Sequence, residues 1–241
     1  LWFSDEANAT YTYGHISDWN VSQVTDMHEA FKGRTTFNED ISGWDVRYVT
    51  NMSEMFKNAN AFNQPIGDWN VSSVTDMNNM FTSSGALIFN QPLGDWDVSS
   101  VTNMRGMFSM ATYFNQPIGD WNVSSVTDMS FMFSDNDHGI QFNQPINKWD
   151  VSSVTNMEKM FFRSSFFNKL IDDWNVSSVI NMSGMFDNAT ALSDVNKGEI
   201  HKTFSTNSNW PYPSWSAYAV YTPLTDSNFQ TAVNLWFSDE A

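Results

Sequence analysis

The amino-acid sequence predicts an α/β repeat solenoid of about seven coils, each combining a short parallel strand with a short helical turn. Tryptophan recurs at intervals of 25, 25, 27, 25, 28 and 25 residues, which sets the length of one coil. One motif, F-N-Q-P-I-G-D-W-[ND]-V-S-S-V-T-[DN]-M-x-x-M-F, surrounds these tryptophans and is clearest at residues 62–81 and 114–133. The tryptophans, expected to stack as a core column, are Trp19, Trp44, Trp69, Trp96, Trp121, Trp149 and Trp174.

The unit at residues 62–81 shows why two elements are expected in each coil. Trp69 and Val71 are two residues apart, so their side chains would share one face of a short strand. The apolar residues from position 74 to position 81 follow at helical spacing, and Ser73 with Asp76 resembles a capping box ahead of them. Neither element could bury its apolar face alone, so the coils must stack on one another.

Four segments divide the chain. Residues 1–16 are expected to hold the second half of a capping helix and a lead-in, and residues 17–192 the seven coils. The motif is missing from residues 193–223, which are rich in Ser, Asn, Pro and aromatic residues. A flexible linker would contain few aromatic residues, so this segment is expected to cap the last coil. The capping aromatic residues would be Phe204, Trp210, Tyr212 and Trp215.

Residues 224–241 are expected to form an amphipathic helix that begins a further module. Their apolar residues recur at helical spacing, and residues 235–241 repeat the sequence LWFSDEA of residues 1–7. The repeated heptapeptide predicts a tandem array with a register of 234 residues, in which this chain is one module cut within that helix. The residues expected at the contact between modules, besides the four capping aromatic residues, are Trp2, Phe3, Phe229, Val233, Trp236 and Phe237.

An asparagine follows the motif's first Phe in successive coils. We expect these asparagines to form a buried ladder in which each side chain bonds the backbone of the next coil. The competing hypothesis is a row of ligand-binding amides. The asparagines are Asn38, Asn63, Asn90, Asn115, Asn143 and Asn168.

Composition excludes several classes of partner. The net charge of −16 disfavours nucleic acids and anionic membranes, and no apolar run is long enough to cross a bilayer. The chain has no cysteine, and its four histidines lack metal-binding spacing, so we expect neither an enzyme nor a zinc site. No cofactor is expected other than calcium, which suits oxygen-rich sites. Stacked coils would place Asp68, Asp95 and Asp120 in one column, where calcium or hydrogen bonds could offset their mutual repulsion.

The sequence contains several N-x-[ST] sequons, half of which belong to the motif itself. In the motif the serine that follows is expected to cap the helical turn instead. Glycans are therefore expected at Asn8 and Asn188, near the two ends of the array, if the source is eukaryotic.

The unit FNQPIGDWNVSSVTDMSFMF at residues 114–133 resembles the repeat of BspA-like surface proteins, a mycoplasma-type lipoprotein repeat grouped with the leucine-rich repeats. The resemblance covers roughly residues 16–192 and carries no catalytic residues. It implies a leucine-rich-repeat-like solenoid on an extracellular or cell-surface protein, with a role in adhesion or surface architecture. The chain departs from the pattern at Arg47-Tyr48, at Ile180 and at residues 168–174.

Two functions follow as hypotheses. In the first, the chain is an extracellular structural module of a tandem array, and its partners are copies of itself, covalently in tandem and also laterally, in a fibre or adhesive layer. In the second, it is a multivalent binding module that recognises glycan or protein through one face of the solenoid.

Overall fold

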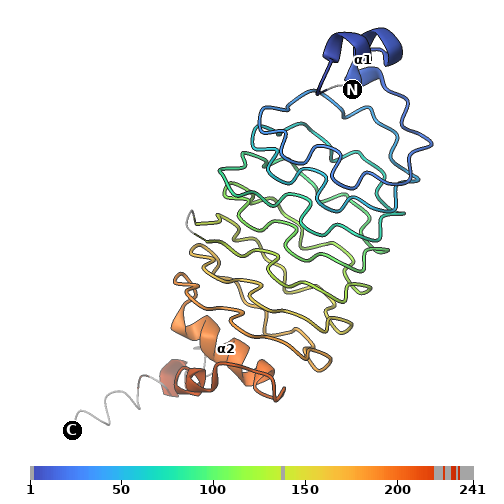
Figure 1. Ribbon diagram of the computed structural model, residues 1–241. Helices are drawn as coiled ribbons and strands as arrows, with labels where there is room; N and C mark the ends of the chain where they lie inside the picture. Colours follow the sequence, from blue (N-terminus) through green and yellow to red (C-terminus); the bar gives the residue numbers. More distant parts are fainter. Residues whose placement is uncertain (1–2, 137–138, 220–224, 226–228, 232, 234–241) are drawn as a thin grey trace.

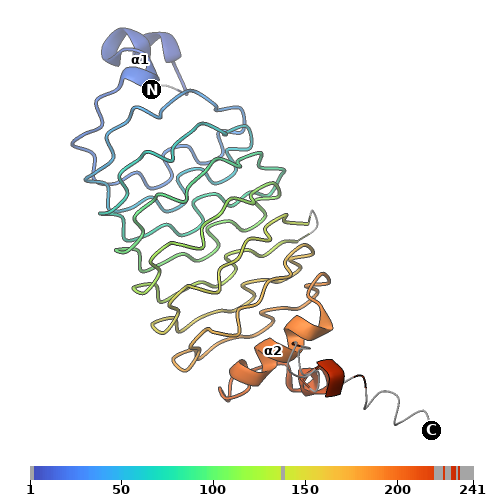
Figure 2. The ribbon, with the colours of Figure 1, turned by 180° about the vertical axis from the view of Figure 1, so that it is seen from behind.

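The computed structural model describes residues 3–136, 139–219, 225, 229–231 and 233. Coils are stacked in one direction, with helix α1 (Glu6–Tyr13) at one end of the stack and helix α2 (Asp194–Phe204) at the other (Figures 1 and 2). Two 3₁₀ helices, η1 (Ile16–Asp18) and η2 (Pro213–Ala217), complete the elements that the structure defines. The expected stack of coils is present.

The predicted α/β character of the coils is wrong. Between residues 19 and 192, the described part of the chain contains turns and single bridges, with neither a strand nor a helix. Each bridge is parallel and joins the Asp or Asn before the first Met of the motif to its counterpart in the next coil. These isolated bridges are Asp26–Asn51, Asn51–Asp76, Asp76–Asn103, Asn103–Asp128, Asp128–Asn156 and Asn156–Asn181.

A left-handed residue in each coil explains why the predicted helical turn does not form. The residue before the second Met of the motif has a φ between 51° and 64°, and a right-handed helix cannot pass through such a residue. Backbone N–H groups on either side then point to the next coil, where that of Asn79 donates to Arg105 (2.8 Å) and that of Phe81 to Met107 (2.9 Å). The left-handed residues are Glu29, Glu54, Asn79, Gly106, Phe131, Lys159 and Gly184.

Turns also shorten the predicted strand. The N–H of Trp69 donates to the carbonyl of Ile66 (3.2 Å), and that of Val74 donates to Val71 (2.9 Å), so the chain reverses twice within nine residues. The Thr-[DN] segment that follows these turns bonds the preceding coil, as the N–H of Thr75 does with Thr50 (2.8 Å). The apolar residues that suggested strand and helix are nevertheless buried, because they point inward from these turns.

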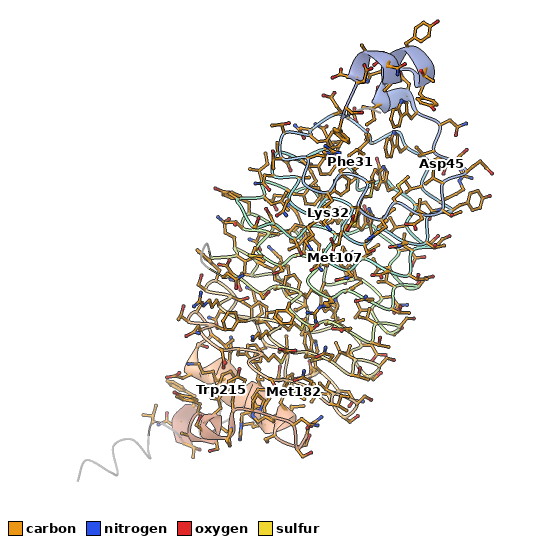
Figure 3. The ribbon with its side chains drawn as sticks, in the orientation of Figure 1. Phe31, Lys32, Asp45, Met107, Met182 and Trp215 are labelled. Carbon is orange, nitrogen blue, oxygen red and sulfur yellow. The ribbon has the colours of Figure 1, made fainter. Side chains whose placement is uncertain are left out.

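Phenylalanine rings form the centre of the core. The Phe after the second Met and the Phe before Asn form a double column, in which Phe56 lies 3.9 Å from Phe62 of its own coil and 5.6 Å from Phe81 of the next, with the rings stacked. Phe62 stacks in turn on Phe89 of the next coil (5.9 Å). Met side chains such as Met107 and Met182 fill the interior beside them (Figure 3). Because each ring contacts the rings of both neighbouring coils, burial in one coil depends on the next.

The prediction that residues 1–7 form the second half of a helix is wrong for residues 3–5. Phe3 and Ser4 lie in a turn, and α1 begins only at Glu6. Asp5 is the N-cap residue of α1, and its carboxylate accepts the N–H of Asn8 (3.0 Å). The second heptapeptide, residues 235–241, lies outside the described residues.

Candidate functional site

The tryptophan column links the coils through hydrogen bonds as well as burial. Each indole N–H donates to a backbone carbonyl of the preceding coil over 2.9 to 3.2 Å. Stacked indole pairs occur at Trp19–Trp44 (6.4 Å) and Trp149–Trp174 (6.2 Å). The donor–acceptor pairs are Trp44–Ile16, Trp69–Ile41, Trp96–Ile66, Trp121–Leu93, Trp149–Ile118 and Trp174–Ile146.

The asparagines form a ladder along one edge of the stack. The side-chain oxygens of Asn38, Asn63, Asn90, Asn115 and Asn143 each accept the backbone N–H of the next asparagine at 2.9 or 3.0 Å. Asn168 completes the row by accepting the N–H of Ser193, the N-cap of α2. The expected burial is wrong, because these side chains are half-buried or exposed. Glutamines next to them, such as Gln64 bonding the Asn38 carbonyl (2.7 Å), add rungs that the sequence did not indicate.

A second row of polar residues explains the motif's alternation between Asn and Asp after Trp. The Asn70 side chain accepts both the N–H (3.1 Å) and the hydroxyl (2.7 Å) of Ser72, and Asp97 accepts the N–H of Ser99 (3.1 Å) in the same turn. Asn and Asp both supply the required oxygen, so either residue suits the position. Hydrogen bonds from the Ser99 hydroxyl and backbone hold the pKa of Asp97 below its usual range.

We expect Asp97→Asn to leave stability near pH 7 within about 0.5 kcal/mol of the wild type, because the amide oxygen can accept the same N–H. A carboxylate whose pKa is lowered by folding stabilises the protein above its unfolded pKa of about 3.9, and that contribution is lost as the pH falls. In urea unfolding between pH 7 and pH 2.5, the wild type should therefore lose more unfolding free energy than the variant below about pH 4. The reverse substitution Asn122→Asp should show the opposite trend, and parallel pH profiles would contradict the assignment.

The predicted carboxylate column is interrupted. Asp68 and Asp95 are exposed and line one shallow hollow. Asp120 is paired with Lys148 (2.9 Å), which occupies the equivalent position of the next coil. Among the described residues, no group of three or more His, Asp or Glu side chains is arranged to hold a metal ion. Calcium at this column stays a prediction, and it would take most of its oxygen ligands from water.

The sequon asparagines fall into two groups. Those of the motif, such as Asn70, use their side-chain oxygen in the turn with the following serine. Asn8 lies exposed on α1, and Asn188 is exposed in the last coil with a φ of 60°. The glycosylation predicted at Asn8 and Asn188 therefore concerns residues at the surface.

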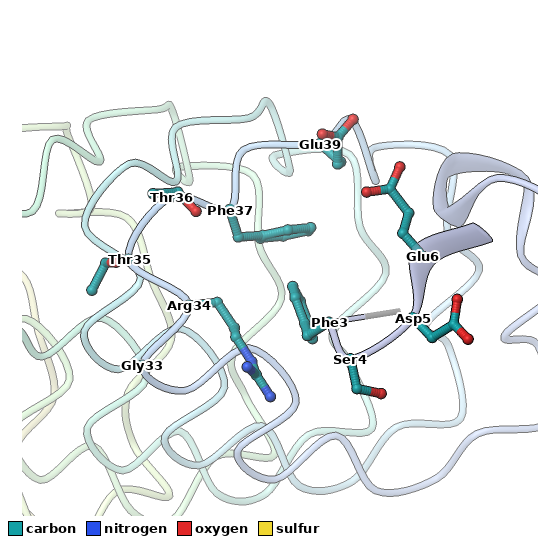
Figure 4. Close-up of a pocket in the computed structure, with 10 residues that line it drawn as sticks. All are labelled: Phe3, Ser4, Asp5, Glu6, Gly33, Arg34, Thr35, Thr36, Phe37 and Glu39. Atoms are coloured by element: carbon teal, nitrogen blue, oxygen red, sulfur yellow. The ribbon is translucent and has the colours of Figure 1, made fainter. Parts of the chain in front are cut away.

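The N-terminal end of the stack carries a ring from the first heptapeptide. Phe3 packs edge-on against Phe31 (6.0 Å) and Phe37 (5.7 Å), at the end of the phenylalanine column, and the Arg34 guanidinium lies 4.2 Å from its ring centre. Figure 4 shows Phe3, Arg34 and Phe37 converging beside a hollow of about 480 Å³. Phe3 is still 38% exposed, so this end is only partly covered.

The other half of the same end is open. Tyr13, Trp19, Val21 and Val24 line an apolar hollow of about 520 Å³. The Trp19 indole bonds the carbonyl of Gly14 (3.0 Å) and stacks on Trp44 of the next coil. An apolar hollow at the end of a stack is a candidate contact surface for another protein element.

The C-terminal cap closes the last coil with both rings and hydrogen bonds. Trp210, Tyr212 and Trp215 pack on Phe186, the last ring of the column, at 6.3, 6.2 and 5.5 Å, and Phe204 is buried against Trp210 (5.2 Å). The Tyr212 hydroxyl accepts the N–H of Phe186 (2.8 Å) and donates to Asp187 (2.9 Å). Burial raises the pKa of Tyr212, with the hydrogen bond to Asp187 acting in the same direction, so the phenol remains neutral.

Two asparagines of the cap were not singled out by the sequence. The Asn207 side chain donates to the carbonyls of Val176 (2.7 Å) and Val179 (2.8 Å), and Asn209 donates to Val179 (3.3 Å).

Of the residues predicted at the contact between modules, Phe229 is exposed and Val233 is helical. Trp2, Trp236 and Phe237 lie outside the described residues.

The stacked coils and their end caps define a tandem-repeat protein. The chain matches the family described as "Mycoplasma protein of unknown function, DUF285" over residues 3–92 and 84–198, and it belongs to this family. This confirms the mycoplasma-type part of the resemblance. No curated protein and no solved structure matches the chain. No helix in the described part of the chain is long and apolar enough to cross a membrane.

Proposed function

We propose that the chain is a structural module of a BspA-like surface protein, which stacks end to end with further copies in an extracellular fibre or adhesive layer. The observation that carries this proposal is the heptapeptide LWFSDEA, which occurs at residues 1–7 and again at residues 235–241. In the first copy, Phe3 contacts the terminal rings of the phenylalanine column. The second copy carries Phe237 at the equivalent position, so it has the same ring to offer to the first coil of a further module.

The N-terminal end has the properties of a surface that another module would cover. Its apolar hollow at Tyr13, Trp19, Val21 and Val24 is open, and Phe3 remains partly exposed. Within the coils, carbonyl groups accept N–H groups from the preceding coil, as Asn51 does from Met27 (2.9 Å). In the described part of the chain, the corresponding carbonyls of the first coil, those of Asp26, His28 and Ala30, accept no backbone N–H from another coil. Unpaired edges of this kind favour association with another chain. We assign the hollow to residues 224–234 of the preceding module, whose apolar residues recur at helical spacing ahead of the second heptapeptide.

Fixed contacts between successive modules would generate a filament. A head-to-tail contact with a constant rotation that does not close into a ring extends without limit. The net charge of −16 per 241 residues would keep the sides of neighbouring filaments apart unless cations or specific contacts bridge them. A surface fibre therefore agrees with the apolar hollow at the end of the module and with the negative charge on its sides.

The test uses a chain of two modules joined through one shared LWFSDEA, compared with a variant in which the Trp and Phe of the shared heptapeptide are replaced by Ser. Single-particle imaging and small-angle scattering should show one preferred angle and distance between the modules. The variant should show a broad distribution of both, with each module still folded. Freely jointed modules in the unmodified chain would overturn the proposal and favour a tethered binding array.

A further inference from the structure

A hollow on the side of the stack brings positive charge together in this acidic protein. Arg105 and Lys159, from coils that are two apart, line a hollow of about 270 Å³ with Phe131 and Phe162. The chain has 27 acidic and 11 basic residues, yet none of the described lining residues is acidic. By contrast, the hollows at Phe3, at Asp68 and at Asp120 are each lined by carboxylates.

The two cations are held in place by one aromatic ring. The Arg105 guanidinium lies 4.7 Å from the ring centre of Phe131, and the Lys159 ammonium lies 5.6 Å from the same centre. Lys159 is also 5.6 Å from the ring centre of Phe162. The Arg105 side chain donates one hydrogen bond, to the hydroxyl of Ser130 (2.8 Å). A guanidinium has five N–H donors, so most of its donors are available to a ligand.

The ring between the cations sits in a costly conformation. Phe131 has a φ of 60°, at a position that is glycine in two other coils, Gly106 and Gly184. A bulky residue in the left-handed region is unusual, and such strain is concentrated at functional sites. Neither the core nor the ladder between coils requires an aromatic side chain at this position, since Asn79 and Glu54 serve there elsewhere.

Among the described residues, no carboxylate forms an ion pair with Arg105 or Lys159; Asp187, which lies near the Lys159 stem, accepts the Tyr212 hydroxyl. Glu158 accepts the side-chain amide of Asn181 on the next coil (3.4 Å), and Asp135 is buried and accepts the N–H groups of Asn136 and Gly139. Asp137 lies outside the described residues. Six other basic side chains do pair with carboxylates: Lys32, Arg47, Lys57, Lys148, Lys197 and Lys202.

We propose that this hollow binds one acidic sugar residue of a polysaccharide, through its carboxylate or sulfate group. A guanidinium presents parallel donors that match a planar carboxylate, and an ammonium adds a second point of charge. The half-buried Phe162 ring, over which Lys159 and Arg163 lie 5.6 and 5.3 Å from the ring centre, adds an apolar wall for the C–H groups of a sugar ring. The amides of Asn79 and Asn136 suit its hydroxyl groups. The volume admits a single ring. Charges more than about 8 Å away are screened at physiological ionic strength, so the net charge of −16 does not decide binding here.

The site is independent of end-to-end stacking, so a single module tests it. Calorimetry at about 0.15 M salt, where distant charges are screened, would compare an oligogalacturonate, a sulfated heparin oligosaccharide and neutral maltohexaose as probes. The double variant Arg105→Gln, Lys159→Gln should weaken binding of an acidic probe at least tenfold. The matched control Lys148→Gln, Lys202→Gln removes the same charge elsewhere and should change the Kd less than twofold. Equal melting temperatures would show that both variants fold.

Four outcomes would overturn the proposal. Neither acidic oligosaccharide binds, or the double variant binds as tightly as its control, or poly-glutamate binds as tightly as the oligosaccharides with the same dependence on Arg105 and Lys159. Phe162→Leu separates a sugar site from a bare ion site. It should weaken oligosaccharide binding at least threefold and leave inorganic sulfate binding unchanged. Equal oligosaccharide binding by Phe162→Leu would also contradict a sugar site.

Discussion

Trp121→Ala is expected to lower the free energy of unfolding by about 3–5 kcal/mol, as for other buried large aromatic side chains. Trp121 is only 4% exposed, and its ring lies 6.3 Å from that of Phe108. Its indole N–H also donates to the carbonyl of Leu93 in the preceding coil (2.9 Å). The substitution therefore leaves a cavity and a carbonyl without a partner, and both effects reach the neighbouring coils.

Two further variants separate the contributions of Trp121. Trp121→Phe keeps an aromatic ring but leaves the Leu93 carbonyl without its donor, so it should cost less than alanine, about 1–3 kcal/mol. Tyr113→Ala removes an exposed aromatic residue near the same coil and should stay within about 0.5 kcal/mol of the wild type. Urea unfolding and thermal melting measure all three. If Trp121→Ala melted within a degree of the wild type, Trp121 would not belong to the core.

The stack could be predicted because its core repeats with the chain. A residue that fills the same place in every coil must recur once per coil, so the spacing of Trp69, Trp96 and Trp121 locates the coils directly. The aromatic cap was predictable for a related reason, because Trp210 and Trp215 lie where the motif stops and a last coil needs a cover.

The conformation within each coil could not be predicted from local patterns. Positions 74 to 81 have the apolar spacing of a helix, but Asn79 is left-handed, and its N–H bonds the next coil. Other coils have Glu54 and Lys159 at this position, and neither residue type favours the left-handed region. The ladder between coils imposes the conformation, and it depends on contacts about 25 residues apart in the sequence.

Some of the polar contacts could be predicted from the sequence and others could not. The asparagine ladder could be proposed because one residue type repeats, whereas the bonds made by indole N–H groups and by Gln64 depend on how adjacent coils align. The interruption of the carboxylate column could have been seen in the sequence, since Gly43 and Lys148 stand where other coils have Asp. Arg105 and Lys159 were missed because they vary from the motif at its two unspecified positions.

Trp215→Ala is expected to destabilise the C-terminal end of the stack by about 3 kcal/mol while leaving the middle coils nearly unchanged. Trp215 is 9% exposed and lies 5.5 Å from Phe186, 5.5 Å from Trp210 and 4.8 Å from Tyr212. Losing this ring loosens the cap that carries the Tyr212 hydroxyl, so the N–H of Phe186 would lose its acceptor. The last coil should then open locally, without unfolding of the whole chain.

Hydrogen exchange resolved along the chain measures this difference. In Trp215→Ala, exchange should speed up at residues 176–192 and stay unchanged at residues 62–81, whereas in Trp121→Ala it should speed up on both sides of the substitution. Tyr11→Ala, at an exposed position of α1, serves as the control at the opposite end. Such a gradient is expected of a stack in which each coil contacts only its neighbours. Equal acceleration along the whole chain in Trp215→Ala would instead mean that the coils unfold as one cooperative unit, and that the cap is as essential to the first coil as to the last.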